Sequence, residues 1–184
     1  MPEKQFLSET EKTRLLELAR QSIARGLRGE RRPPADPLPT ALRTAGAAFV
    51  SLHKNKLLRG CIGSLEPSAS LAASVMENAF SAAFRDPRFP PLTADELPEI
   101  KIEISVLTPP VAIENPERFI VGRHGIVLTS RGRRAVFLPQ VAPQQGWDRE
   151  TALRHLAAKA GLDPEAWRDP QARLEVFEAI VFGE

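Results

Sequence analysis

The hydrophobic residues of this chain recur with two periods, one typical of helices and one typical of strands. Helical spacing is clearest over 9–27, where Ser8-Glu9-Thr10-Glu11 forms a capping box at the start. Strict alternation is clearest over 100–107, where every second residue from Ile100 to Val106 is β-branched and the residues between are mostly polar. We therefore expect a helix over 9–27 and a half-buried strand over 100–107.

Similar patterns predict the remaining elements. Strands are expected at 47–53, at the Cys61 segment, at 125–129 and at 133–138, with hairpin turns at 54–56 and 130–132. A β-rich segment is expected over 173–182. Helices are expected over 67–84, from 148 to 160, and as short turns from 93 and from 163, with a proline-rich connector over 31–39. Hairpins without a repeated βαβ unit favour an α+β fold over a doubly wound sheet.

Composition narrows the class of protein. A chain of 184 residues suits one domain, and 42% hydrophobic with 26% charged residues is ordinary for a globular protein. No apolar run is long enough for a transmembrane helix, and the N-terminal segment has no signal-peptide pattern. One cysteine permits no internal disulfide. We expect a cytoplasmic protein.

The densest chemistry lies in the segment Leu-Arg-Gly-Cys-Ile-Gly-Ser-Leu-Glu-Pro at 58–67. Glycine weakens a strand unless another group must approach closely, so Gly60 and Gly63 indicate a close approach. Cys61 is the candidate nucleophile or redox group, because a nearby cation or backbone N–H can lower the pKa of a thiol. On a regular strand Arg59 shares its face, and His53 across the hairpin is a candidate base. The alternative is a small buried cysteine with a packing role.

Anion binding is a second hypothesis for the same segment. Arg59, the turn between the two glycines and Ser64 would hold a carboxylate or phosphate, with acidic and basic side chains as polar walls. The predicted ligand-binding residues are Arg59, Gly60, Ile62, Gly63, Ser64, Glu66, Asp86, Arg88 and Glu103. The structural alternative is that Asp86 and Arg88 brace the proline-rich loop, and that Glu103 is the solvent side of its strand.

Metal and nucleic-acid sites receive less support. The histidines at 53, 124 and 155 lack the close spacing of zinc ligands, so we predict neither a metal site nor a cofactor. Arg131, Arg133 and Arg134 form a basic cluster that would bind nucleic-acid phosphates. No paired aromatic RNA-recognition signature accompanies them, so an RNA-binding module is the weaker alternative to a solvated hairpin.

Several sequence blocks resemble the AMMECR-type domain family, and specifically the proteins called AmmeMemoRadiSam system protein A. In the first part of the chain they are AFVSL at 48–52, LRGCIGSLEP at 58–67, AAFRDPRFPP at 82–91 and IEISVLTPP at 102–110. The C-terminal half adds FLPQV at 137–141, QGWD at 145–148, KAGL at 159–162 and AW at 166–167. They occur in the family's order, so the resemblance extends over nearly the whole chain.

This resemblance implies a single AMMECR-type domain over 8–182. Its fold would be mainly antiparallel sheet with flanking helices, in two lobes around a cleft that the cysteine motif faces. The resemblance also implies a Memo-like protein and a radical-SAM protein as partners. Two functions follow: an anion-binding cleft in which Cys61 is catalytic, or a non-catalytic adaptor that presents a substrate to a partner. An adaptor would dock through Arg133, Arg134, Gln145 and Trp147, since arginine and tryptophan often anchor interfaces.

Overall fold

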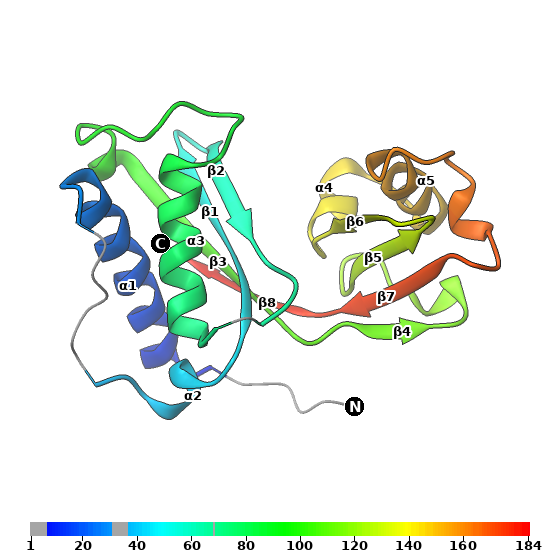
Figure 1. The fold of residues 1–184 in the computed structure, drawn as a ribbon, viewed down its shortest axis with the longest axis horizontal. Helices are drawn as coiled ribbons and strands as arrows, with labels where there is room; N and C mark the ends of the chain where they lie inside the picture. Colours follow the sequence, from blue (N-terminus) through cyan, green and yellow to red (C-terminus); the bar gives the residue numbers. More distant parts are fainter. Residues whose placement is uncertain (1–6, 31–36, 68) are drawn as a thin grey trace. The chain divides into compact units, whose positions relative to one another are not determined.

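The computed structural model describes residues 7–30, 37–67 and 69–184, which form two compact units (Figure 1). The first unit comprises the chain up to Leu107 together with Ile180–Glu184, and the second comprises Thr108–Ala179. Each unit has its own hydrophobic core. Most of the connector expected over 31–39 lies outside the described residues.

The first unit is a four-stranded antiparallel sheet with helices, and its strand order is β2-β1-β3-β8. Its helices are α1 (Glu9–Leu27), α2 (Thr40–Arg43), α3 (Leu71–Phe84) and the 3₁₀ turn η1 (Leu97–Glu99). Its strands are β1 (Ala47–Lys54), β2 (Leu57–Gly63), β3 (Ile100–Leu107) and β8 (Ala179–Gly183). The predicted capping box of α1 is confirmed: the Ser8 hydroxyl accepts the Glu11 N–H, and the Glu11 carboxylate accepts the Ser8 N–H.

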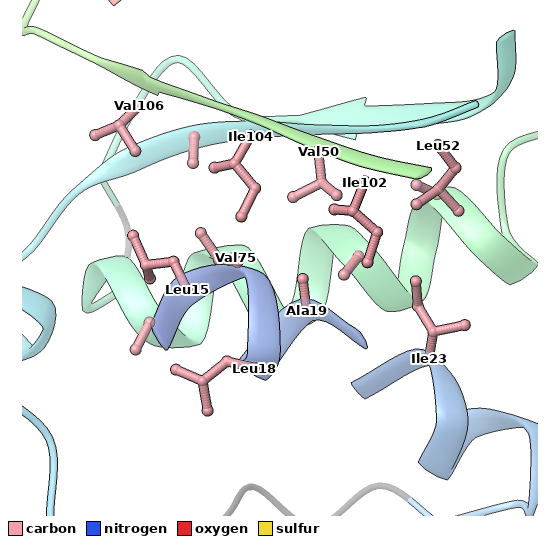
Figure 2. Close-up of a cluster of buried hydrophobic side chains, with 14 of the residues drawn as sticks. Leu15, Leu18, Ala19, Ile23, Val50, Leu52, Val75, Ile102, Ile104 and Val106 are labelled. Carbon is pink, nitrogen blue, oxygen red and sulfur yellow. The ribbon is translucent and has the colours of Figure 1, made fainter. Parts of the chain in front are cut away.

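The core of this unit lies between one face of the sheet and helices α1 and α3. The alternation predicted for β3 is confirmed from Ile100 to Ile104, and Ile102 and Ile104 point into this core beside Val50 and Leu52 of β1 (Figure 2). Burying such side chains stabilises the unit by roughly 1.5–3 kcal/mol each. Ser105 and Leu107 are buried as well, so the end of the strand is buried on both faces instead of half-buried. The intervening residues of β1 are turned to the opposite face of the sheet and are half-buried.

The second unit is a sheet of order β4-β7-β5-β6 with helices packed on it. Its strands are β4 (Val111–Ile113), β5 (Gly125–Ser130), β6 (Arg133–Phe137) and β7 (Arg173–Phe177). Its helices are α4 (Val141–Gln145), α5 (Arg149–Lys159) and the 3₁₀ turns η2 (Pro116–Arg118) and η3 (Ala166–Arg168). As predicted, Asp148 caps α5, and Gly161 after its end has a φ of +70°.

The α+β class is confirmed, and three local predictions need correction. The helix expected from 67 begins at Leu71, because Ser70 is extended and its hydroxyl caps the Ala73 N–H. The turns expected from 93 and 163 form only the 3₁₀ helices η1 and η3. The β-rich segment expected over 173–182 is confirmed, and its two strands, β7 and β8, belong to separate sheets. Among the described residues, no helix is long and apolar enough to cross a membrane.

Candidate functional site

The hairpin between β1 and β2 determines where the cysteine motif lies. Asn55 and Lys56 have φ values of +52° and +65°, so the two strands are joined by a two-residue turn. Lys54 and Leu57 are the first pair after this turn. In a regular antiparallel ladder, each step back along β1 from this pair would be matched by one step forward along β2. The turn alone would therefore set which residue of β1 lies opposite each later residue of β2.

A β-bulge changes this count before it reaches Cys61. The register shifts between Leu52 and His53, and Arg59 is the extra residue of β2. Without the shift Cys61 would pair with a core residue, Val50. With it Cys61 pairs with Ser51. A slip of one residue turns a side chain to the other face, so the bulge places the thiol on the face opposite α1 and α3.

On that face, Cys61, Ser51 and Glu103 form one row across β2, β1 and β3. The Ser51 hydroxyl donates a hydrogen bond to Cys61 Sγ at 3.2 Å. Glu103 is half-buried, and its carboxylate bonds to no other residue that the structure describes. His53, the base considered from sequence, pairs with Leu58 instead of Cys61. Sequence reasoning missed Ser51, because its position opposite the thiol depends on the bulge.

The main chain of Cys61 is held by two side chains from the loop after α3. The Asp86 carboxylate accepts the Cys61 N–H at 2.9 Å, and Arg88 Nη2 donates to the Cys61 carbonyl at 3.2 Å. Arg88 also donates from Nε and Nη2 to Asp86, at 2.9 and 2.7 Å. These Arg88 bonds, with the Cys61 N–H, hold the pKa of Asp86 well below its usual range despite its burial. The pair covers the edge of β2 as a neighbouring strand would.

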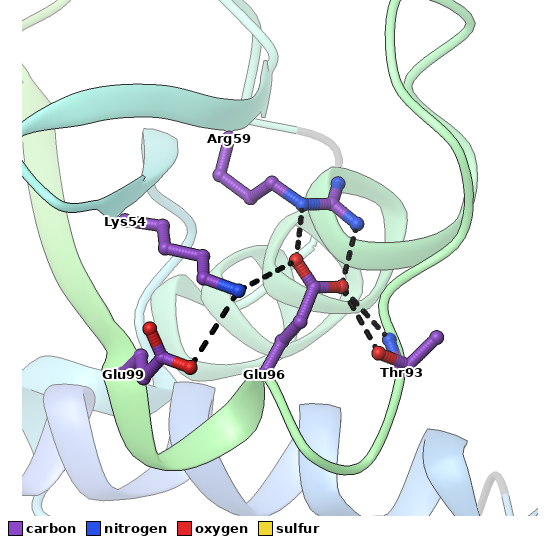
Figure 3. A network of polar contacts seen from close by, with 5 residues as sticks. All are labelled: Lys54, Arg59, Thr93, Glu96 and Glu99. Carbon is purple, nitrogen blue, oxygen red and sulfur yellow. Dashed lines mark hydrogen bonds and ion pairs between the residues drawn. The ribbon is translucent and has the colours of Figure 1, made fainter.

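Arg59 is engaged in a separate polar network with Glu96 (Figure 3). Its Nε and Nη2 each donate to a Glu96 oxygen at 2.9 Å, and both side chains are largely buried. Glu96 also accepts the Thr93 N–H and lies 3.5 Å from Lys54 Nζ. The Arg59 hydrogen bonds lower the pKa of Glu96 to about 2. The bidentate pair commits Nε and Nη2 of Arg59 to Glu96. Arg59 Nη1 is buried and has no hydrogen-bond partner among the described residues.

The two glycines of the motif allow other parts of this chain to approach. A Cβ on Gly60 would lie 2.1 Å from the Ala82 carbonyl oxygen of α3. A Cβ on Gly63 would lie 2.2 Å from the ring of Phe49. The close approach predicted from sequence is therefore made by a helix backbone and an aromatic ring.

The remaining predicted residues of the motif have local contacts. The Ser64 hydroxyl donates to the Glu66 carbonyl at 2.9 Å, and the Ser64 N–H donates to the Ala48 carbonyl. Ile62 is partly buried against the core of the first unit. The structure thus brings Cys61, Asp86 and Arg88 into contact and aligns Glu103 in the same row. It places Arg59 in the Glu96 network.

The predicted docking arginines lie in the second unit and have contacts there. Arg133 Nη1 donates to the Gly161 carbonyl at 2.8 Å, beyond the end of α5. Arg134 lies 3.9 Å from Glu175. In the same basic cluster, Arg131 pairs with Asp169 at 3.1 Å. These contacts brace the hairpin between β5 and β6.

Trp147 belongs to a small aromatic cluster of the second unit. Its indole stacks on the imidazole of His155, with ring centroids 4.1 Å apart and planes 9° apart, and Phe137 lies beside it. Trp147 is half-buried, whereas Gln145 at the end of α4 is exposed. Within the described part of the chain, no three His, Cys, Asp or Glu side chains gather where they could hold a metal ion.

Comparison with known proteins gives the family. The AMMECR1 family model matches residues 16–182. A protein of Methanothermobacter thermautotrophicus is 42% identical over 97% of this chain and 96% of its own length. Protein MK0488 of Methanopyrus kandleri is 42% identical over 100% of this chain and 92% of its own.

A solved structure is also similar. The crystal structure of the uncharacterized protein PH0010 from Pyrococcus horikoshii has a TM-score of 0.92 and 34% identity, covering 98% of this chain and 94% of that one. The sequence blocks, the family match and this likeness all extend over nearly the whole chain. The chain therefore belongs to the AMMECR1 family.

Proposed function

We propose that this chain is the A component of an AmmeMemoRadiSam system, working with a Memo-like protein and a radical-SAM protein, and that Cys61 is its catalytic nucleophile. The observation that carries the enzymatic role is the hydrogen bond from the Ser51 hydroxyl to Cys61 Sγ at 3.2 Å. A donor to sulfur stabilises the thiolate more than the thiol. Because the thiolate is the nucleophile, Ser51 favours the reactive form.

The proposed reaction consists of two displacements. After the thiol proton passes to water, the sulfur attacks an electrophilic carbon of the substrate. The S–C bond forms, and the leaving group departs with the electron pair of the bond that breaks. A second nucleophile, which loses its proton to Glu103, then attacks the same carbon and releases the thiolate. The Glu103 carboxylate suits this role because it is half-buried and forms no hydrogen bond or ion pair with another described residue.

Alkylation of Cys61 by iodoacetamide between pH 5 and 10 tests the first step. The chain has one cysteine, so each modification reports on this thiol. We expect Ser51→Ala to slow alkylation at pH 7 by about three- to tenfold, because the sulfur loses its hydrogen bond from the Ser51 hydroxyl. Mass spectrometry of the intact protein measures the rate.

Ser81→Ala is the matched control. The Ser81 hydroxyl contacts Glu77 on the surface of α3, at 3.5 Å, so its removal should leave the profile unchanged. Identical profiles for the wild type and Ser51→Ala would contradict the role of Ser51. A thiol that reacts only after unfolding in urea would contradict the enzymatic function.

If the Cys61 thiol does not react in the folded protein, the second candidate function is favoured. This is a non-catalytic adaptor that presents a substrate to its partner. The observation that favours an adaptor is that much of the motif serves the fold: Arg59 pairs with Glu96, and Asp86 binds the main chain of Cys61. An adaptor would retain its partners after Cys61→Ser and lose them after Gln145→Ala. Co-purification with a tagged chain distinguishes the two.

A further inference from the structure

The guanidinium of Arg88 is only partly used by its contacts. Of its five N–H groups, Nε and Nη2 donate to Asp86, and Nη2 also donates to the Cys61 carbonyl. Nη1 donates to no residue that the structure describes, and the side chain is 56% exposed. Two charged N–H donors therefore remain available beside the residue that carries the thiol.

The orientation of these donors is fixed. The Asp86 side chain is 2% exposed and accepts three hydrogen bonds from Arg88, including one from its main-chain N–H at 3.1 Å. Such bidentate pairing fixes the plane of the guanidinium, so little conformational entropy is lost when Nη1 binds a ligand. The pKa of Arg88 is raised mainly by its hydrogen bond to Asp86. Its Nη2 lies 3.2 Å from the Cys61 carbonyl oxygen, so the guanidinium is held beside the residue that carries the thiol.

The other cations near the motif have different surroundings. Arg59 is largely buried and forms a bidentate pair with Glu96. Arg85, three residues before Arg88, pairs with Glu77 of α3 at 3.1 Å. Arg88 thus combines available donors with contact to the Cys61 main chain. Of the two arginines predicted from sequence to bind an anion, Arg88 is the one whose side chain is mainly exposed.

We infer that Arg88 Nη1 binds an anionic oxygen of the substrate, so that the substrate carries a carboxylate or phosphate group close to the carbon that Cys61 attacks. This inference rests on the proposed nucleophilic role of Cys61. Asp86 is then a positioning residue, since it holds the guanidinium and does not touch the substrate.

Two alkylating reagents of similar size test the inference. Iodoacetate carries a carboxylate next to the carbon that is attacked, and iodoacetamide is its neutral analogue. The ratio of their alkylation rates cancels any change in the fraction of thiolate. We expect Arg88→Gln to lower the iodoacetate-to-iodoacetamide ratio about fivefold, the size expected for an exposed charge interaction. Circular dichroism verifies that each variant is folded.

Two further variants separate position from charge. Arg85→Gln removes the same charge three residues away and should leave the ratio at the wild-type value. Arg88→Lys keeps the charge but loses the planar fork, and it should lose most of the preference for iodoacetate. An unchanged ratio in Arg88→Gln, or a wild-type ratio in Arg88→Lys, would overturn the assignment to Nη1.

The same measurements distinguish failure of the inference from failure of the proposed function. Slow reaction of the wild type with both reagents contradicts a nucleophilic Cys61 and removes the inference with it. Fast reaction with both but no dependence on Arg88 contradicts the inference alone. Acetate and inorganic phosphate, added as competitors of iodoacetate, identify which anion binds: the preferred one slows wild-type alkylation and has no such effect on Arg88→Gln.

Discussion

At the scale of residues, the cysteine motif divides into groups that the fold uses and groups that remain available. The two glycines admit α3 and the Phe49 ring, and the Arg59 guanidinium is held by Glu96. The Cys61 thiol accepts a hydrogen bond from Ser51, and Arg88 Nη1 donates to none of the residues that the structure describes. The groups of this site that can meet a substrate are therefore the Cys61 thiol and the Arg88 guanidinium.

The ion pair of Arg59 and Glu96 makes stability depend on pH. The folded-state pKa of Glu96 is about 2, below its ordinary value of 4.5. Ionised Glu96 therefore adds to the free energy of unfolding above about pH 4.5, and this contribution is lost as the pH falls toward 2. At pH 7 we expect Glu96→Gln to lower the free energy of unfolding by about 1–3 kcal/mol. Urea unfolding at pH 7 and at pH 3 measures the difference.

At pH 3 Glu96 is mostly protonated in the unfolded chain and still ionised in the folded protein, so folding must release a proton and part of the stabilisation is already lost. The difference between Glu96→Gln and the wild type should therefore be smaller at pH 3 than at pH 7. Glu77→Gln is the matched control, because Glu77 pairs with Arg85 on the exposed surface of α3. It should cost less than about 0.5 kcal/mol at either pH. A loss for Glu96→Gln that is equally large at both pH values would contradict the electrostatic account.

At the scale of elements, the contact between β2 and α3 depends on the absence of a side chain at Gly60. A Cβ there would lie 2.1 Å from a backbone oxygen, so the helix or the strand must move. We expect Gly60→Ala to lower the free energy of unfolding by about 2–3 kcal/mol. Chemical denaturation, monitored by circular dichroism, measures the loss.

Gly132→Ala serves as the comparison, because a Cβ at this turn meets nothing within 4 Å and only its φ of +73° is unfavourable. Its cost should be about 1 kcal/mol. Equal losses at Gly60 and Gly132 would mean that the clash with α3 is relieved without cost.

At the scale of the whole molecule, the second unit is contiguous in sequence and contains a complete sheet and its own core. We expect a fragment of residues 108–179 to fold alone with a single cooperative transition, although a domain of about 70 residues is marginally stable. Both tryptophans of the chain, Trp147 and Trp167, lie in it. Intrinsic fluorescence therefore compares the fragment with the full chain.

The emission maximum of the folded fragment should match that of the full chain, since the ring of Trp167 is buried within the core of the second unit. A fragment that emits like the urea-unfolded chain and shows no cooperative transition would contradict independent folding. The second unit would then depend on the rest of the chain.

The sequence by itself determined the elements that local patterns specify. Periodicity and capping residues gave α1, β3 and α5 nearly to the residue, because caps and hydrophobic spacing act within a few positions. The same locality explains the errors. The first turn expected before Leu71 is replaced by an extended Ser70 that bridges to Ala45, a contact between distant residues.

Only the tertiary structure decided what the motif does with each group. The partner of Arg59 lies 37 residues away and that of the Cys61 N–H lies 25 residues away, and no spacing rule relates such positions. The face occupied by Cys61 depends on one bulge, which shifts its partner from Val50 to Ser51. A strand has a side-chain period of two, so that single residue decides whether the thiol enters the core or lies on the opposite face of the sheet. The sequence thus identified the cysteine segment, and the tertiary contacts decided which of its side chains are available to a ligand.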